Sequence, residues 1–354
     1  MTRIAERTQG GAADLESAAK PALLEVENLR VEFPTRRGTL VAVDDISFHI
    51  NEGEVLGVVG ESGAGKSMTG TAVIGLLEPP GRIAGGEVRL NGRRIDNLPY
   101  EQLRRIRGRE IGMVFQDPLT SLNPLYTVGQ QLTETIQTHT DMNDGQARRR
   151  AIELLTEVGI PAPDRRIDQY PHQFSGGMRQ RVVIALALCV NPRLVIADEP
   201  TTALDVSIQA QIIKLLKKLC HDHGAAVMLI THDMGVIAET ADRVAVMYSG
   251  RIVEVGPVRE VIRNAKHPYT HGLMGSIPIV GHDLERLTQI DGSMPRLTEI
   301  PKGCPFNPRC PKVFDRCREE RPELIPVEQS RVACWLYDEQ GLVPAGGREG
   351  GDNV

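Results

Sequence analysis

Residues 60–67 read Gly-Glu-Ser-Gly-Ala-Gly-Lys-Ser and lie between an apolar segment at 54–59 and a helical pattern at 66–77. Glycines without side chains let consecutive backbone N–H groups surround phosphates at the start of a helix. In such a loop Lys66 reaches the β- and γ-phosphates, and the Ser67 hydroxyl binds Mg²⁺. A glycine-rich turn that only joins a strand to a helix is the alternative. The full match instead predicts a nucleoside triphosphate site, here called the phosphate loop, made by Gly60, Glu61, Ser62, Gly63, Ala64, Gly65, Lys66, Ser67 and Met68.

Two carboxylates follow a second apolar segment. Residues 194–197 read Leu-Val-Ile-Ala and lead directly to Asp198 and Glu199, as expected where a buried parallel strand ends at the ligand-binding edge of a sheet. We expect Asp198 to hold Mg²⁺ indirectly and Glu199 to act as general base toward the attacking water. Taken alone, the pair could be two solvated acids at a strand end. Together with the phosphate loop it predicts hydrolysis of ATP with Mg²⁺ as cofactor.

A second glycine loop precedes another helical pattern. Ser175, Gly176 and Gly177, here called the serine-glycine loop, come directly before the apolar-periodic segment 178–190. A helix N-terminus with free backbone amides binds anions. One chain needs only one such loop to hold one nucleotide. The second loop therefore predicts that two chains share each ATP.

The order and spacing of these motifs resemble the ATP-binding subunits of ABC transporters. The resemblance implies a head-to-tail dimer, in which the serine-glycine loop of one subunit faces the phosphate loop of the other across the bound ATP. It also implies three further roles. Gln116 matches the Q-loop residue that contacts Mg²⁺ and senses the γ-phosphate, and Ala203-Leu204-Asp205 matches the D-loop that crosses the dimer interface. His232 matches the switch histidine that contacts the γ-phosphate.

Two positions differ from the commoner residues of this family. Phe33 matches the aromatic residue that stacks on adenine, where many relatives have tyrosine, and a core phenylalanine at a strand end is the alternative. Met178 stands where glutamine is commoner. Because Ser175 and both glycines are present, we still expect the serine-glycine loop to function.

The remaining pattern predicts the supporting elements. Apolar and polar residues alternate over 23–50, which indicates antiparallel strands, and Asn91-Gly92 indicates a further hairpin. Between about 116 and 171 the pattern is helical, with Asn143 as an expected N-cap. Buried strands and helices alternate after the two acids. The predicted fold class is α/β, the ABC-type nucleotide-binding domain of P-loop NTPases, with a mainly parallel core sheet, an antiparallel β subdomain and an inserted helical subdomain.

Length and composition limit the organisation of the chain. With 354 residues it has room for one large domain at 23–264 and a small extension at 265–337, but not for two nucleotide-binding units. The partner ATPase subunit, identical or paralogous, must be a separate chain. The tails at 1–22 and 338–354 are rich in small and charged residues, so we expect them to be disordered.

Charge and hydropathy bear on the partners. The net charge of −5 gives no general attraction to nucleic acid, and no segment approaches the roughly 20 apolar residues that span a bilayer. We therefore expect a peripheral protein at the cytoplasmic face of the cell membrane. The resemblance implies two integral membrane permease subunits as partners and, indirectly, an extracytoplasmic solute-binding protein. A soluble ABC-type ATPase acting on nucleic acid is the alternative, disfavoured because the segment between the two glycine loops is compact.

The extension points to one branch of the family. His267-Pro-Tyr-Thr270 and the segment at 115–124 resemble the oligopeptide and dipeptide transporter branch, which implies peptides or related solutes such as nickel chelates as cargo. The order of these motifs leaves the solute itself open.

Four cysteines lie in the extension, at positions 304, 310, 317 and 334. Disulfides are disfavoured in a cytoplasmic chain, so the clustered thiols suggest a metal site. Cys304, Cys310, Cys317 and Cys334 lack the paired spacing of structural zinc sites. Two of them precede proline, as in iron–sulfur ligation, and members of the branch are similar in carrying a [4Fe–4S] cluster, which we therefore predict; zinc and unliganded thiols are the alternatives. We expect a structural role, far from the phosphates.

Overall fold

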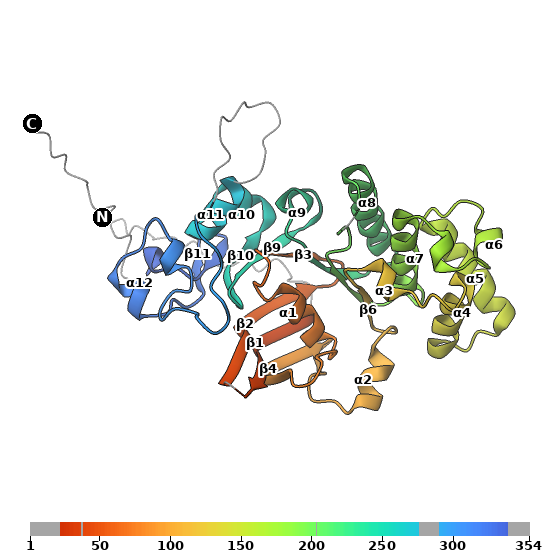
Figure 1. Cartoon of the computed structure of the whole chain (residues 1–354), viewed down its shortest axis with the longest axis horizontal. Coiled ribbons are helices and arrows are strands. Elements are labelled where there is room, and N and C mark those ends of the chain that lie inside the picture. The colour runs from red at the N-terminus through yellow and green to blue at the C-terminus, as the bar shows by residue number, and fades with distance from the viewer. Residues whose placement is uncertain (1–21, 37, 203, 276–289, 339–354) are drawn as a thin grey trace, which may run out of the picture.

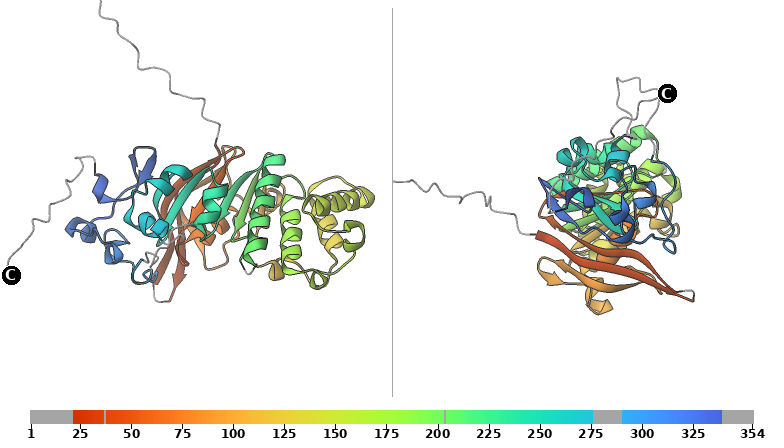
Figure 2. Two further views of the ribbon diagram at one scale, coloured as in Figure 1. Left: turned by 90° about the horizontal axis from the view of Figure 1, so that it is seen from above. Right: turned by 90° about the vertical axis from the view of Figure 1, so that its left-hand side faces the viewer.

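The computed structural model describes residues 22–36, 38–202, 204–275 and 290–338. Figure 1 shows an elongated molecule with the C-terminal extension at one end, the helical subdomain at the other, and two sheets between them. Figure 2 shows the same order from above. The predicted tails fall almost wholly outside the described residues, as does Ala203 of the expected interface segment.

The core sheet has the order β11-β12-β10-β9-β3-β8-β7-β6. The pairs from β9 through β6 are parallel, and β10, β12 and β11 add antiparallel strands at the opposite edge. This confirms the mainly parallel sheet. The strands are β3 (Val55–Val59), β6 (Ile111–Val114), β7 (Leu194–Asp198), β8 (Ala226–Ile230), β9 (Arg243–Tyr248), β10 (Arg251–Pro257), β11 (Ile325–Val327) and β12 (Ser330–Val332).

A smaller antiparallel sheet has the order β2-β1-β4-β5. Its strands are β1 (Ala22–Thr35), β2 (Gly38–Asn51), β4 (Arg82–Leu90) and β5 (Arg93–Arg94). Asn91 and Gly92 both have positive φ, 53° and 75°, which is the conformation of the two-residue turn that their sequence predicts. The predicted antiparallel β subdomain is confirmed.

Helices occupy the segment between β6 and β7 and both faces of the core sheet. The α-helices are α1 (Lys66–Val73), α2 (Tyr100–Ile106), α3 (Pro118–Ser121), α4 (Val128–His139), α5 (Asp144–Glu157), α6 (Pro163–Arg166), α7 (Gly176–Leu188), α8 (Val206–Asp222), α9 (Met234–Thr240), α10 (Val258–Arg263), α11 (Pro268–Gly275) and α12 (Asp315–Glu319). Short 3₁₀ helices are η1 (Pro171–Gln173), η2 (Asn307–Arg309) and η3 (Trp335–Tyr337). Asn143 caps α5 as predicted, because its side chain accepts a hydrogen bond from the N–H of Gln146 at 3.0 Å.

The core sheet is buried on both faces, as its uninterrupted apolar strands require. In β7, Val195 and Ala197 belong to the apolar cluster that includes α4, α5 and α7 to α11, while Leu194 and Ile196 belong to the cluster that includes α1 and the antiparallel sheet. All five residues of β7 are buried. Because each buried aliphatic side chain contributes about 1.5–3 kcal/mol, this packing fixes the strand end that carries Asp198. Within the described ranges, no helix is both long and apolar enough to cross a bilayer.

The extension is joined to the core sheet, a connection that the sequence did not indicate. Strand β12 pairs with β10 through Glu254 and Val255. The buried carboxylate of Glu254 accepts hydrogen bonds from the N–H groups of Lys266 and His267, each at 2.9 Å. Burial raises the pKa of Glu254, and these two hydrogen bonds oppose that shift. The start of the extension is therefore fixed to the strand that precedes it.

Candidate ATP-binding site

The phosphate loop connects β3 to α1 and packs against two other strands. Gly60 and Gly65 have φ angles of 153° and 99°. A Cβ atom at Gly60 would lie 2.3 Å from the carbonyl oxygen of Met247 in β9, and one at Gly65 would lie 2.9 Å from that of Ala42 in β2. Only glycine fits at these two positions, because both the backbone conformation and the close approach exclude a side chain.

Lys66 lies inside the loop that it is predicted to serve. Its ammonium donates hydrogen bonds to the carbonyl oxygens of Gly60 at 2.8 Å and Glu61 at 3.1 Å. Burial lowers the pKa of Lys66, and the carboxylates of Glu199, Asp198 and Glu61 oppose that shift. The positive charge of Lys66 is thus held within the phosphate loop, where it suits an anionic ligand.

Ser67 and Asp198 meet across the site. The Ser67 hydroxyl donates to Asp198 Oδ1 at 2.8 Å. Burial raises the pKa of Asp198, while the hydrogen bond from Ser67 lowers it. A buried carboxylate beside a hydroxyl supplies the oxygen donors that Mg²⁺ prefers, and a bound cation would offset the cost of burying that charge. These two residues fit the predicted Mg²⁺.

Glu199 contacts three other side chains at the end of β7. Its Oε2 accepts hydrogen bonds from Gln116 Nε2 at 3.2 Å and from Thr202 Oγ1 at 2.9 Å, and its Oε1 lies 3.4 Å from His232 Nδ1. Glu199 has a φ of 44°, a strained conformation for a residue other than glycine. Gln116 follows β6 and His232 follows β8, the two strands that flank β7. The structure therefore brings together Gln116, Glu199 and His232 as the sequence suggested, and adds Thr202, which no motif indicated.

The serine-glycine loop lies elsewhere in the same chain. Ser175 caps α7 by accepting a 3.4 Å hydrogen bond from the N–H of Met178. A Cβ atom at Gly176 would lie 3.6 Å from Leu204, and one at Gly177 would lie 2.9 Å from Ile208. This loop is therefore next to the expected interface segment, on the helical-subdomain side of α1 in Figure 1.

Three residues of that surface are exposed: Ser175, Gly176 and Asp205. Exposure suits a role opposite a second subunit, which stays a prediction. The ring of Phe33 lies against Gly81, where an added Cβ would be 2.6 Å away. Its stacking on adenine also stays a prediction.

The extension contacts the phosphate loop. The backbone N–H of Glu61 donates to the Tyr269 hydroxyl at 2.9 Å. Arg309 Nη1 donates to both carboxylate oxygens of Glu61, at 3.0 and 3.1 Å. The contact arises because β10 runs beside β9 and carries the extension back to the loop. The sequence indicates Tyr269 only as part of a family motif, and nothing in it indicates Arg309.

The four cysteines line one cavity. Cys304, Cys310, Cys317 and Cys334 surround it together with the rings of His267, Phe306 and Trp335. Burial raises the pKa of Cys304 to about 11 and that of Cys334 to about 12. Among the described residues, however, no group of three or more His, Cys, Asp or Glu side chains is arranged to hold a metal ion. Four soft donors around one cavity suit a thiolate-bound metal chemically, but their present arrangement does not form its site.

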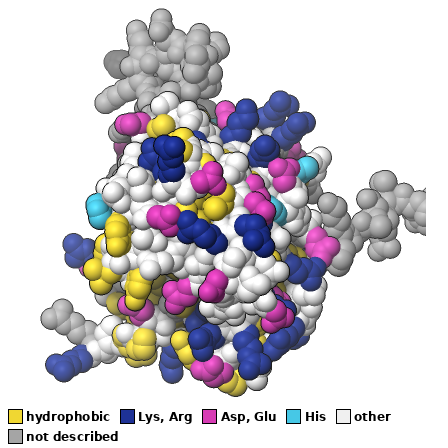
Figure 3. Space-filling view, turned by 90° about the vertical axis from the view of Figure 1, so that its right-hand side faces the viewer, with side chains coloured by type: hydrophobic (Ala, Val, Ile, Leu, Met, Phe, Trp, Pro, Cys, Tyr) yellow, Lys and Arg dark blue, Asp and Glu magenta, His cyan; other side chains and the backbone are white. Residues whose placement is uncertain are grey.

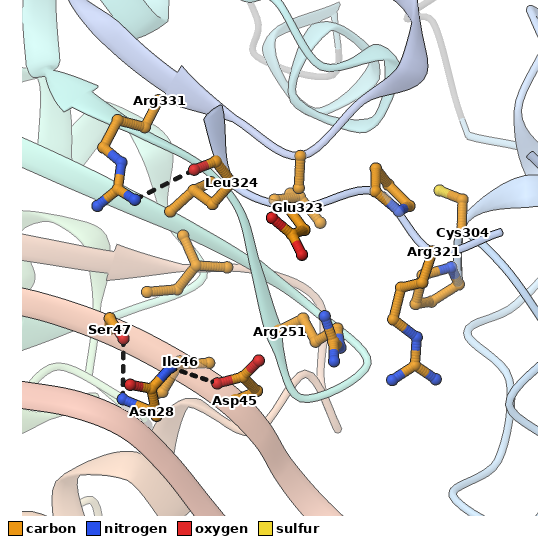
Figure 4. Close-up of a pocket in the computed structure, with 15 residues that line it drawn as sticks. Asn28, Asp45, Ile46, Ser47, Arg251, Cys304, Arg321, Glu323, Leu324 and Arg331 are labelled. Carbon is orange, nitrogen blue, oxygen red and sulfur yellow. Dashed lines mark hydrogen bonds between the residues drawn. The ribbon is translucent and has the colours of Figure 1, made fainter. Parts of the chain in front are cut away.

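A separate cavity of about 280 Å³ lies between the antiparallel sheet and the extension (Figure 4). Its charged groups largely pair with each other or with neighbours. Arg251 Nε donates to Asp44 Oδ2 at 3.1 Å, and Arg321 Nη1 donates to the same oxygen at 2.6 Å. Asn28 Nδ2 donates to Asp45 Oδ1 at 2.8 Å. The contacts to Asp44 hold the extension and β10 against β2 beside this cavity.

Comparison with known proteins gives consistent results for both parts of the chain. Residues 43–202 match the family model of ABC transporters, and residues 253–317 match that of the oligopeptide/dipeptide transporter C-terminal region. The chain is 46% identical to the oligopeptide transport ATP-binding protein AppD of Bacillus subtilis over 90% of this chain and 98% of that protein. It is 48% identical to the dipeptide transport ATP-binding protein DppD of Escherichia coli over 89% of this chain and 97% of that protein.

Solved structures agree with the fold. The dimeric ATP-binding cassette MJ0796 in a post-hydrolysis state, bound to ADP and Pi, superposes with a TM-score of 0.61 at 30% identity. The match covers 67% of this chain and 99% of that one. The P-loop NTPase fold of ABC cassettes is thereby confirmed.

Proposed function

Because this chain belongs to the ATP-binding subunits of ABC transporters, in their oligopeptide and dipeptide branch, we propose that it hydrolyses MgATP to power the import of peptides or related small solutes. The observation that carries the proposal is the group formed by Gln116, Glu199 and His232 beside the Ser67–Asp198 pair. In this proposal these side chains act at the γ-phosphate of a triphosphate held by the phosphate loop. The group suits hydrolysis rather than binding alone.

The reaction follows from what each side chain can do. Lys66 offers a cation to the β- and γ-phosphates, and Ser67, with Asp198 hydrogen-bonded to it, would hold Mg²⁺, which would supply neutralisation of the phosphate charge. Glu199 accepts a proton from the attacking water, while Gln116 and Thr202 fix the orientation of its carboxylate. His232, 3.4 Å from Glu199, is the proposed contact to the γ-phosphate. The residues contribute mainly by positioning and by charge stabilisation.

A dimer completes the proposed site. ABC cassettes work as dimers, and the exposed serine-glycine loop and Asp205 provide a surface for a second ATPase subunit, either identical or paralogous. In this arrangement Ser175, Gly176 and Gly177 of one subunit close over the phosphate loop of the other. MgATP binding then brings the two helical subdomains together, and hydrolysis separates them.

The segment after Gln116 is the proposed contact with two integral membrane permease subunits. Several large hydrophobic side chains around it are exposed, including Leu119, at 63%, and Leu125, at 80%, next to Tyr126. Figure 3 shows hydrophobic side chains among charged ones on the helical-subdomain end of the molecule. Such apolar groups on a mainly polar surface are suited to a protein partner. The chain would then be peripheral at the cytoplasmic face of the membrane and would depend only indirectly on an extracytoplasmic solute-binding protein.

The proposal extends to the four-cysteine cavity. We propose that Cys304, Cys310, Cys317 and Cys334 bind a [4Fe–4S] cluster, with zinc as the alternative. The support is their common cavity and their Cys-Pro context. Iron, sulfide and zinc analysis of anaerobically purified protein tests this. Iron and acid-labile sulfide in equal amounts support the cluster, whereas zinc without iron, or no metal at all, refutes it.

Transport is tested with the chain assembled with its permease subunits in proteoliposomes. We expect Mg²⁺-dependent ATP hydrolysis that is stimulated by a peptide-loaded solute-binding protein, together with ATP-dependent peptide uptake. Glu199→Gln should lower both about 10²–10⁴-fold. Tight, salt-sensitive DNA binding without copurifying membrane subunits would instead favour the nucleic-acid alternative.

A further inference from the structure

The extension holds one residue of the phosphate loop from two sides. The Tyr269 hydroxyl accepts the backbone N–H of Glu61, and Arg309 binds both oxygens of its carboxylate. The carbonyl oxygen of the same residue accepts a 3.1 Å hydrogen bond from the ammonium of Lys66. Extension, loop backbone and phosphate-binding lysine therefore form one continuous hydrogen-bonded path.

Arg309 is held rigidly at its end of this path. Only 6% of its side chain is exposed. Its guanidinium lies 5.8 Å from the ring centre of Tyr248 and 6.0 Å from that of Phe306. It also donates to the backbone carbonyl oxygens of Ile290, Asp291 and Gly292. A guanidinium fixed by so many contacts cannot follow a displacement of Glu61, so it anchors that residue.

Tyr269 is equally constrained. It is fully buried, and its ring meets that of Tyr248 edge-on with centres 4.7 Å apart. Its ring also packs against Phe306, with centres 5.4 Å apart. A buried phenol needs a hydrogen-bond partner, and here the partner is the backbone of the phosphate loop.

Electrostatics gives this contact a second consequence. Glu61 places a carboxylate in a loop predicted to bind a triphosphate, where an unpaired negative charge would repel the ligand. Arg309 draws the carboxylate toward the extension and neutralises it. The extension thus makes an acidic residue compatible with a phosphate-binding loop.

We propose that Tyr269 and Arg309 are positioning residues for nucleotide binding: they fix the backbone at Glu61, from which Lys66 is held, and cancel the Glu61 charge. The inference rests on the proposed binding of ATP by the phosphate loop and is independent of the transported solute. It gives the C-terminal extension a direct part in ATP affinity.

Affinity for MgATP in the full-length chain assembled with its partner subunits tests this inference. Arg309→Ala should weaken binding about tenfold, within the range of coupling between neighbouring sites. Tyr269→Phe removes only the hydroxyl and should weaken it about threefold, with little effect on kcat at saturating ATP. The double variant Arg309→Ala/Glu61→Gln should bind more tightly than Arg309→Ala alone, because it removes the orphaned charge.

The matched control is Arg316→Ala. Arg316 is another ion-paired arginine of the extension, but its partners Glu320 and Asp338 lie in the extension and directly after it, not in the phosphate loop. Equal weakening in this control, or affinities within twofold of wild type for both Arg309→Ala and Tyr269→Phe, would overturn the inference. If Arg309→Ala does not fold, Arg309→Lys and Tyr269→Phe decide the question. Failure of the wild-type protein to bind ATP would refute the proposed function instead.

Discussion

Replacing Glu199 by glutamine removes one negative charge and should leave the surrounding structure intact. In the wild-type protein Oε2 accepts hydrogen bonds from Gln116 and Thr202, and Oε1 faces His232. A glutamine can place its carbonyl oxygen toward the two donors and its amide toward the ring nitrogen of His232. Every partner of the side chain is then satisfied. The variant therefore isolates the ability of Glu199 to accept a proton.

The magnitude follows from that single loss. General base catalysis contributes about 10²–10⁴ in rate, which corresponds to roughly 3–5 kcal/mol of the activation barrier. Lys66, Ser67 and Asp198 keep their contacts in the variant. We therefore expect kcat to fall about 10²–10⁴-fold while the affinity for MgATP stays within a few-fold of wild type.

Hydrolysis by the assembled complex and binding of a fluorescent ATP analogue measure these two quantities. Glu239→Gln is the matched control, because Glu239 is an exposed residue of α9 and its loss changes the net charge by the same amount. A Glu199→Gln variant that binds MgATP normally and hydrolyses it within tenfold of wild type would refute the assignment of Glu199 as the base. Loss of binding would show instead that the carboxylate has a structural role.

Three further predictions concern the loop, the buried acid and the dimer. Gly60→Ala should unfold at lower temperature and lose ATP binding, because its Cβ would lie 2.3 Å from the Met247 carbonyl oxygen. At Gly63, which also has a positive φ, a Cβ would meet no atom within 4 Å, so Gly63→Ala should lose less stability and less ATP binding. Equal losses in the two variants would contradict the packing argument. Burial raises the pKa of Asp198, so its charged form destabilises the fold. Asp198→Asn should therefore raise the melting temperature by about 2–4 °C at neutral pH, by less as the pH falls through that pKa, and should abolish Mg²⁺-dependent stabilisation by ATP. A lower melting temperature of the variant without nucleotide would disprove this. Ser175→Arg should leave ATP binding by the separate chain unchanged but lower hydrolysis in the assembled dimer at least 100-fold. This is the scale of losing one charge-stabilising contact. Undiminished hydrolysis would exclude a shared site.

The sequence predicted best those elements whose information is local. The phosphate loop needs glycine at Gly60 and Gly65 for reasons of backbone space that leave a visible pattern. Asn143 caps its helix through a hydrogen bond to a residue three positions later, so its role can also be predicted from the local sequence. Apolar strands that are buried on both faces, such as β7, are similarly distinctive.

Contacts between distant segments left no such pattern. Tyr269 and Arg309 lie 208 and 248 residues from Glu61, so nothing near either residue indicates the loop as its partner. The strands β11 and β12 have three residues each and are recognisable only by their pairing, β11 with β12 and β12 with β10. The family resemblance recorded that the His-Pro-Tyr element is present, whereas its contact with the nucleotide site depends on the three-dimensional path of the chain.

Strand order explains why the phosphate loop lies between the proposed catalytic residues and the extension. The motifs occur along the chain in the order β3, β6, β7, β8, but in the sheet β3 lies between β8 and β9. On one side, β8, β7 and β6 deliver His232, Glu199 and Gln116 to the ligand edge. On the other side, β9 packs against Gly60 and leads through β10 to the extension. A change in the extension can therefore reach the phosphate loop at Glu61 without passing through the catalytic group, and would alter affinity for ATP before it altered the chemical step.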